Sequence, residues 1–257
     1  MANSPGFDIT LGVEYQAALM AESYRHRPPY HPHAFELLSS LSQAGSVLDL
    51  GCGTGLICRP LSQRVKHIDA VDFSASMIQV GQSLQYGKAP NLHWHCADVT
   101  NIQLGHDYQL VTAGESLHWF DARAMAPKIR QWLSNRQGTL ALLVNQLLAL
   151  PWWDKRLESL WERYRTFACV APKPIHEMAQ EHGLQPLSHA HFEPHPWTLC
   201  IDGFIELVHS RNGFSRAVMD PRQAVQFDAQ IRNVMLSLFP GDLVTLQFST
   251  SVYFASP

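Results

Sequence analysis

Charged residues are scarce in this sequence, and neither sign dominates. Asp, Glu, Lys and Arg make up 16% of the 257 residues, and the formal net charge is -3. A protein that binds a nucleic-acid backbone needs a surplus of Lys and Arg to neutralise the phosphates. The composition therefore argues against a nucleic-acid partner and favours chemistry on a small molecule.

Long apolar runs are also absent. The most apolar region, residues 140–153, is interrupted by Asn145 and Gln146 and falls short of the roughly 20 residues that a membrane-spanning helix requires. Residues 1–8 lack a basic run followed by an apolar stretch, which is the pattern of a secretory signal. We therefore expect a cytoplasmic protein without a membrane span.

Patterns that bind metals or form disulfides are missing as well. The five cysteines are irregularly spaced and include no CxxC pair, which is typical of reduced thiols. His189, His191 and His195 lie close together, but no set of carboxylate and cysteine partners accompanies them. We expect neither structural zinc nor a catalytic metal.

Short apolar runs alternate with segments in which apolar residues recur at helical spacing. The runs predict buried parallel strands at residues 46–50, 67–72, 92–96, 108–113 and 139–144. Alternation of this kind implies right-handed crossovers, with helices on both faces of a doubly wound parallel sheet. A helix over residues 56–65 should follow the first strand. The chain length suits one α/β domain over residues 1–257.

The two ends of this alternating region predict additional structure. Residues 13–24 read as a helix that ends before Pro28 and Pro29, and residues 1–33 as an N-terminal helix and lid. Beyond Pro151 the spacing becomes helical again, so residues 151–186 predict an inserted helical cap over the open end of the sheet. Two more strands, over residues 187–201 and 243–254, complete the chain.

The segment from Val47 to Gly55 is a strand that runs into a glycine-rich turn. Gly51, Gly53 and Gly55 lack side chains, so the backbone there can approach a ligand closely. Dinucleotide-binding enzymes carry GxGxxG, whereas residue 56 here is Leu. This spacing disfavours a nicotinamide-dependent oxidoreductase, which remains the alternative enzyme class.

Acidic and apolar residues after the next two strands complete a nucleoside site. Asp72 ends the second strand, about 20 residues beyond the loop, where a carboxylate can accept hydrogen bonds from ribose hydroxyls. Phe73 and Met77 follow on the same turn and could flank an adenine ring. Asp98 lies after the third strand, where it could accept a bond from the adenine amino group or hold a turn.

Four segments together resemble the class I S-adenosylmethionine-dependent methyltransferases: residues 47–55, 71–78, 97–98 and 110–121. The 117–120 stretch and the segment from Tyr24 to Tyr30 look like the branch that contains trans-aconitate methyltransferase and related small-molecule enzymes. The resemblance implies a Rossmann-like, seven-stranded sheet whose last strand is antiparallel. It also implies S-adenosylmethionine as cofactor.

The same resemblance assigns roles to individual residues. It places Gly51, Gly53 and Gly55 near the methionine part of the cofactor, Asp72 on the ribose and Asp98 near adenine. Val99 and Ala113, at the ends of the third and fourth strands, complete the predicted cofactor site.

The acceptor side of the site is less marked in the sequence. His118 follows the fourth strand and is the candidate general base, with a structural histidine as the alternative and Glu115 as a second base candidate. Tyr24 and Arg27 could close over the cofactor. Candidates for an apolar acceptor pocket, or for packing within the cap, are Trp119, Trp152 and Trp161.

These features predict a methyltransferase, as a monomer or homodimer, that acts on a carboxylate, hydroxyl or ring nitrogen of a small molecule. Transfer from a sulfonium depends chiefly on in-line positioning and exclusion of water, so a base is optional. A non-catalytic module that binds S-adenosylmethionine is the other alternative, because fold alone does not settle function.

Overall fold

The computed structural model describes residues 18–105, 107–133, 138–166, 177, 180 and 188–255. The start of the predicted first helix, at residues 13–17, lies outside the described residues. So does most of the predicted insertion beyond residue 166.

One seven-stranded sheet, in the order β3-β2-β1-β4-β5-β7-β6, organises the molecule. Strands β1 to β5 pair in parallel, and β7 runs antiparallel to both of its neighbours. The strands are β1 Ser46–Leu50, β2 His67–Asp72, β3 Leu92–Cys96, β4 Leu110–Gly114, β5 Thr139–Leu147, β6 Ser188–Cys200 and β7 Leu243–Ala255. The predicted doubly wound sheet with one antiparallel strand is confirmed.

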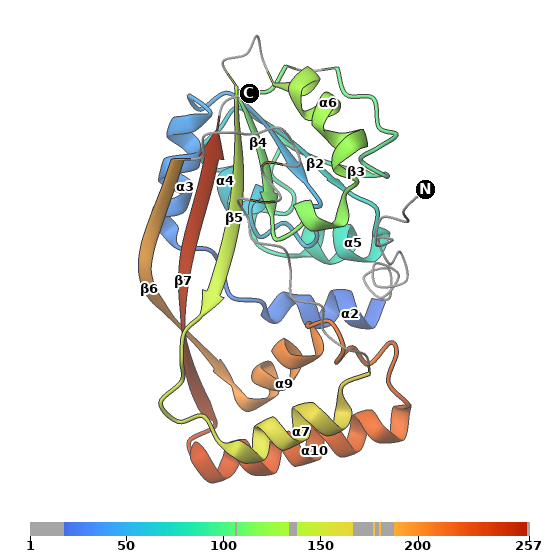
Figure 1. The fold of residues 1–257 in the computed structure, drawn as a ribbon, viewed down its shortest axis with the longest axis vertical. Coiled ribbons are helices and arrows are strands. Elements are labelled where there is room, and N and C mark those ends of the chain that lie inside the picture. The colour runs from blue at the N-terminus through green and yellow to red at the C-terminus, as the bar shows by residue number, and fades with distance from the viewer. Residues whose placement is uncertain are drawn as a thin grey trace.

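Alternate residues of β1 face opposite sides of the sheet, which gives the sheet two cores. Val47 packs with α3 (Pro32–Leu41) and α4 (Cys58–Leu61) on one face. Leu48 and Leu50 pack with α6 (Ala122–Trp132) on the other face. Figure 1 shows these helices on the two sides of the strands. Because the strand order reverses between β1 and β4, the chain leaves these neighbours in opposite directions and a crevice forms beyond their carboxyl ends.

The helix after the glycine loop is shorter than predicted. Residues 56–65 read as one helix, but α4 covers only Cys58–Leu61. Pro60 has no backbone N–H, so it cannot donate the bond that would tie this turn back to Leu56. Proline is tolerated in the first turn of a helix, and that is where the structure places it.

A layer of three helices covers the carboxyl end of β5 (Figure 1). Helix α7 (Lys155–Tyr164) lies against α10 (Pro221–Leu238), and α10 contacts α9 (Ile201–His209). Only α7 comes from the predicted insertion at residues 151–186; α9 and α10 follow β6. We call these three helices the cap.

The N-terminal segment lies between the sheet and the cap. Helix α2 (Ala18–Ser23) continues as the tighter η2 turn (Tyr24–His26), and the two contact α5 (Ala75–Ser83) on one side and α9 on the other. The tightening precedes the extended path imposed by the prolines. No helix in the described part of the chain is long and apolar enough to cross a membrane.

Asp69, on β2, connects its own strand with β3 and with the segment that precedes β4. Its carboxylate accepts a 2.7 Å hydrogen bond from the Tyr108 hydroxyl, and the Nε2 atoms of His67 and His95 lie 2.7 and 2.6 Å from it. Burial raises the pKa of Asp69, but the bonds from Tyr108, His95 and His67 outweigh burial, so the pKa is below the usual value.

We predict that Asp69→Asn lowers the free energy of unfolding at pH 7 by about 1–3 kcal/mol, because the paired charge is lost. A carboxyl whose pKa is depressed by folding stabilises the protein above the unfolded-state value of about 3.9, and this contribution fades as pH falls below it. Urea unfolding at pH 7, 5 and 3.5 measures both effects. Asp107→Asn, at an exposed site, is the control. Equal acid sensitivity of Asp69→Asn and the wild type would contradict the prediction.

Candidate active site

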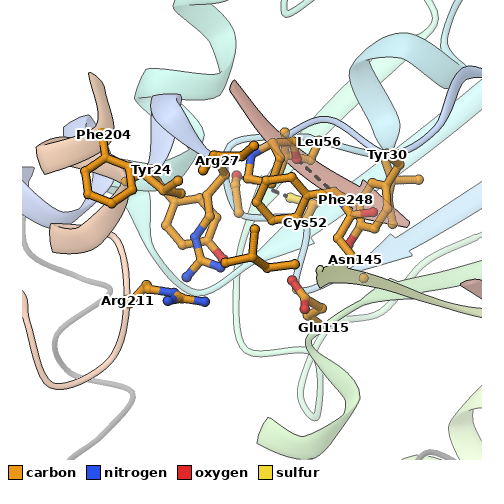
Figure 2. Close-up of a pocket in the computed structure, with 18 of the residues that line it drawn as sticks. Tyr24, Arg27, Tyr30, Cys52, Leu56, Glu115, Asn145, Phe204, Arg211 and Phe248 are labelled. Atoms are coloured by element: carbon orange, nitrogen blue, oxygen red, sulfur yellow. Dashed lines mark hydrogen bonds between the residues drawn. The ribbon is translucent and has the colours of Figure 1, made fainter. Parts of the chain in front are cut away.

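A cavity of about 1030 Å³, its open mouth included, lies between the glycine loop and the cap. Gly51, Gly53 and Leu56 line one end, and side chains of α7 and α9 line the other. The polar side chains along it are Tyr24, Arg27, Tyr30, Asp49, Glu115, Asn145 and Arg211. Figure 2 shows Glu115, Arg27 and Arg211 around the same space.

Gly51 and Gly53 both have positive φ, at 64° and 54°, but they serve the loop differently. A Cβ on Gly51 would lie 2.6 Å from the Cβ of Ser116, so this glycine allows close packing of protein on protein. A Cβ on Gly53 would have only Tyr24 Cε1 within 4 Å, at 3.9 Å. Gly53 therefore presents open backbone to the cavity. Gly55 packs beneath Trp94 and does not line the cavity.

Asp72 fastens this loop to the second strand. One carboxylate oxygen accepts a 2.8 Å bond from the Gly53 amide, and the other accepts a 2.8 Å bond from the Ser74 amide. Burial raises the pKa of Asp72, while these two amides lower it. A carboxylate has about four acceptor positions, so two remain for a ligand. Asp72 does not line the cavity, and its ribose role stays a prediction.

Asp49, which the sequence analysis left without a role, faces the cavity from β1. Its Oδ1 accepts a 2.8 Å bond from Thr112, whereas Oδ2 is buried without a hydrogen-bond partner among the described residues. Burial raises the pKa of Asp49 to about 7, and Thr112 and Cys58 offset part of the effect. A buried acceptor beside Gly51 and Gly53 fits a cationic donor such as the ammonium group of methionine. An acidic residue inside an apolar strand was the sequence signal for this position.

The predicted lid residues, Tyr24 and Arg27, line the cavity beside the glycine loop, and their closing over a cofactor stays a prediction. The Arg27 guanidinium lies 4.7 Å from the centre of the Tyr24 ring and donates a 2.6 Å bond to the Ser210 carbonyl. Ser23 donates a 2.6 Å bond to Glu206 on α9. Burial raises the pKa of Tyr24, so its phenol stays neutral. The segment is thus pinned to the cap rather than to the sheet alone.

Glu115 is, in addition to Asp49, a second carboxylate residue that lines the cavity. It follows β4 with a φ of 50°, an uncommon conformation for a residue with a side chain. This turn directs the carboxylate toward the cavity (Figure 2), and the residue is exposed there. Burial raises the pKa of Glu115, whereas Arg27 and Arg211 lower it.

His118 and Trp119 do not line this cavity. They lie on η3 (Leu117–Trp119) with ring centroids 4.7 Å apart. Burial lowers the pKa of His118, which favours the neutral imidazole. Trp161 does line the cavity, but Trp152 packs against Phe239 and its neighbour Trp153 lines the wall instead.

The predicted adenine-side residues lie outside this cavity too. Asp98 accepts bonds from the Thr100 amide and hydroxyl, at 2.8 and 2.7 Å, which is the turn role left open by its sequence position. Of the other predicted cofactor residues, Phe73 is 43% exposed. The remaining three, Met77, Val99 and Ala113, are buried. Their cofactor contacts stay predictions. No group of three or more His, Cys, Asp or Glu within the described ranges is placed to hold a metal ion.

Known proteins are similar to the part of the chain that carries the glycine loop. Residues 47–136 match the family described as "Methyltransferase domain". A malonyl-[acyl-carrier protein] O-methyltransferase of Bacillus cereus is 35% identical over 96 residues, which cover 34% of this chain and 35% of that enzyme. An uncharacterized methyltransferase of Mycobacterium bovis is 27% identical over 161 residues, covering 57% of this chain and 81% of the relative.

Solved structures show the same fold over a longer span. A protein of Anaeromyxobacter dehalogenans proposed to be a type II methyltransferase has a TM-score of 0.65 and 17% identity, with 90% of this chain and 97% of that chain covered. A Haemonchus contortus phosphoethanolamine N-methyltransferase has a TM-score of 0.53 and 11% identity, with 100% and 61% covered. The narrower likeness to trans-aconitate methyltransferase stays a prediction. In its sheet order, its glycine loop and these matches, the chain is similar to the class I S-adenosylmethionine-dependent methyltransferases, and the stretch that matches the methyltransferase domain is residues 47–136.

Proposed function

We propose that this chain transfers a methyl group from S-adenosylmethionine to a carboxylate, hydroxyl or ring nitrogen of a small molecule. The observation that carries the proposal is the continuity of one cavity, which runs from the Gly51–Gly53 backbone to an apolar compartment beneath the cap. A cofactor held at the loop end would present its reactive end to an acceptor held at the cap end. Tyr24 and Arg27 line the cavity beside the glycine loop, where they can limit the access of water to a bound cofactor.

The loop end offers charges that are complementary to an amino acid. Asp49 Oδ2 is a buried acceptor for an ammonium group, and the Arg27 guanidinium provides positive charge for a carboxylate. Gly53 leaves its backbone open between them. These groups would hold the methionine part of S-adenosylmethionine, and Asp72 would hold its ribose through the acceptor positions that the loop leaves unused.

The cofactor, when bound, supplies an electrophilic methyl group: an acceptor lone pair forms the new bond to carbon, and the broken C–S pair stays on sulfur as S-adenosylhomocysteine. The residues of the chain align the acceptor with the methyl group and accept a proton if the acceptor releases one. A carboxylate acceptor releases no proton. A hydroxyl or a ring N–H releases one, and Glu115 is a titratable acid lining the cavity that can receive it.

The relatives give some support to oxygen as the accepting atom. The Bacillus cereus protein is named for O-methylation of a malonyl group on a carrier protein. The match covers about a third of that enzyme and of this chain, so it supports the transfer chemistry more than any particular acceptor. The spacing of Gly51, Gly53 and Gly55 and the match to the methyltransferase domain disfavour the alternative of a nicotinamide-dependent oxidoreductase. The Glu115 carboxylate, which lines the cavity and can receive a proton, disfavours a purely non-catalytic module.

We predict that Asp72→Ala weakens S-adenosylhomocysteine binding by on the order of 2–4 kcal/mol, because the mutant loses ribose acceptors and the tie to Gly53. Titration calorimetry measures this, with Asp107→Asn as the surface control. An unchanged affinity in the mutant, or tighter binding of NADH than of S-adenosylhomocysteine by the wild type, would refute the cofactor assignment.

Asp49 should make cofactor binding depend on pH. With its pKa raised to about 7, the carboxyl is largely neutral at pH 6 and largely ionised at pH 8. An ammonium ligand prefers the ionised form, so affinity for S-adenosylhomocysteine should rise several-fold over this interval. Asp49→Asn should bind more weakly and lose the rise, as measured by calorimetry at both pH values. A rise that persists in the mutant would show that another group titrates.

Glu115 and His118 can be separated kinetically. We predict that Glu115→Gln lowers kcat/KM for a hydroxyl or ring N–H acceptor by about tenfold or more, and that His118→Ala has a smaller effect. Because a general base must be deprotonated, kcat/KM should rise as the pH passes through the raised pKa of Glu115. The Glu115→Gln variant should lose this rising part of the pH–rate profile. Acceptors come from a screen of phenols, carboxylates and nitrogen heterocycles. S-adenosylhomocysteine affinity should stay within about twofold in both variants. A larger loss in His118→Ala would return the base role to that residue.

A further inference from the structure

The cavity changes character from one end to the other. Polar groups line the cavity beside the glycine loop and, through Arg211, just after α9, whereas apolar side chains from α7, α9, residues 150–153, β5 and β7 make up much of the remaining wall. Six of them form the walls: Leu147, Trp153, Trp161, Phe204, Leu246 and Phe248. A small, wholly polar acceptor would leave these surfaces without a partner. The walls therefore fit an acceptor with an apolar body and one polar end.

The aromatic members of this wall are held in fixed orientations. Trp153 and Trp161 meet edge to face, with ring centroids 5.9 Å apart and an interplanar angle of 82°. Trp153 donates a 2.9 Å hydrogen bond from its indole nitrogen to Glu158. Trp161 also packs against Phe214 and Phe227, at 5.7 and 5.8 Å. Rings braced in this way cannot easily collapse onto each other, so they keep defined faces and edges toward the cavity.

We propose that the cap end binds a planar aromatic body of the methyl acceptor, with the accepting group directed toward Glu115 and the glycine loop. Aromatic rings pair through offset-stacked and edge-to-face contacts, for which fixed indole and phenyl rings are well suited. A flexible alkyl chain or a saturated ring gains no such contact. The inference rests on the proposed function, since it assigns a substrate class to the same cavity.

The test compares acceptor analogues that share one carboxylate and differ in the body. Binding of 2-naphthoate, decahydro-2-naphthoate, decanoate and glutarate to the protein saturated with S-adenosylhomocysteine is measured by titration calorimetry. We expect 2-naphthoate to bind at least fivefold more tightly than its saturated counterpart and at least tenfold more tightly than glutarate. Equal or tighter binding of decahydro-2-naphthoate or decanoate would overturn the aromatic assignment.

Variants at Trp161 separate aromatic contact from simple bulk. Trp161→Leu should weaken 2-naphthoate at least fivefold and change decahydro-2-naphthoate by less than twofold, whereas Trp161→Phe should retain most of the 2-naphthoate affinity. Phe239→Ala is the matched control, because it removes an aromatic ring that packs in the cap but does not line the cavity. It should leave the preference for 2-naphthoate unchanged. A loss of that preference in the control, or equal losses for both bodies in Trp161→Leu, would overturn the proposal.

S-adenosylhomocysteine affinity is measured for every variant and separates the two hypotheses. If the wild type does not bind S-adenosylhomocysteine, the proposed function itself fails. If it binds S-adenosylhomocysteine but shows no aromatic preference, only the substrate class fails. Unchanged cofactor affinity in a variant also shows that the variant is folded around the site.

Discussion

The carboxylate of Asp72 holds together the two parts of the chain on which the site depends. It receives the Gly53 amide from the loop after β1 and the Ser74 amide from the start of α5. These bonds fix a glycine turn of positive φ at the crevice where the strand order reverses. Without these two hydrogen bonds, the loop backbone would lose its fixed position relative to β2. The cavity would then lose the wall that Gly51 and Gly53 form. Because Asp72 is buried, its negative charge depends on those same amides for stabilisation.

A second set of contacts positions residues 23–27, the segment that lies over the glycine-loop end of the cavity and is called the roof below. The Glu206 carboxylate accepts a bond from Ser23 and is itself gripped by Arg216 through two bonds of 2.7 and 2.8 Å. Arg216 also binds Asp228 on α10 at 2.9 Å. Such a charge network is specific in geometry more than it is strong. It orients the segment that carries Tyr24 and Arg27 with respect to the cap, so the roof belongs to the fold and is not a free arm.

The sequence predicted the sheet well because buried parallel strands leave a simple signal. Strands such as β1 and β4 are short runs rich in apolar residues that end at a glycine, and few other structures produce that pattern. Helical spacing was less informative, because it reveals an apolar face but not the element that covers it. The cap was therefore predicted from α7 alone, although its packing partners α9 and α10 come from residues after β6.

Side chains near the acceptor were harder to place for a related reason. His118 and Glu115 both follow β4, and sequence position alone did not decide which of them faces the cavity. The left-handed backbone at Glu115 decides it, and a residue other than glycine gives no sequence signal for such a turn. Trp152 and Trp153 are adjacent and chemically identical, so only the packing of Trp152 against Phe239 distinguishes them. The cofactor loop avoided this difficulty because its glycines mark, in the sequence itself, the positions where the backbone adopts a positive φ.

Helix α9 links the two ends of the cavity. Its inner face contributes Phe204 to the apolar wall, while Glu206 and the following Ser210 carbonyl receive the bonds from Ser23 and Arg27. A shift of α9 that widened the acceptor compartment would also stretch the contacts that hold the roof over the glycine loop. The position of the Tyr24–Arg27 segment and the binding of an acceptor thus both depend on the position of α9. Two binding events that favour the same position of one element must reinforce each other, so cofactor and acceptor should bind with positive coupling.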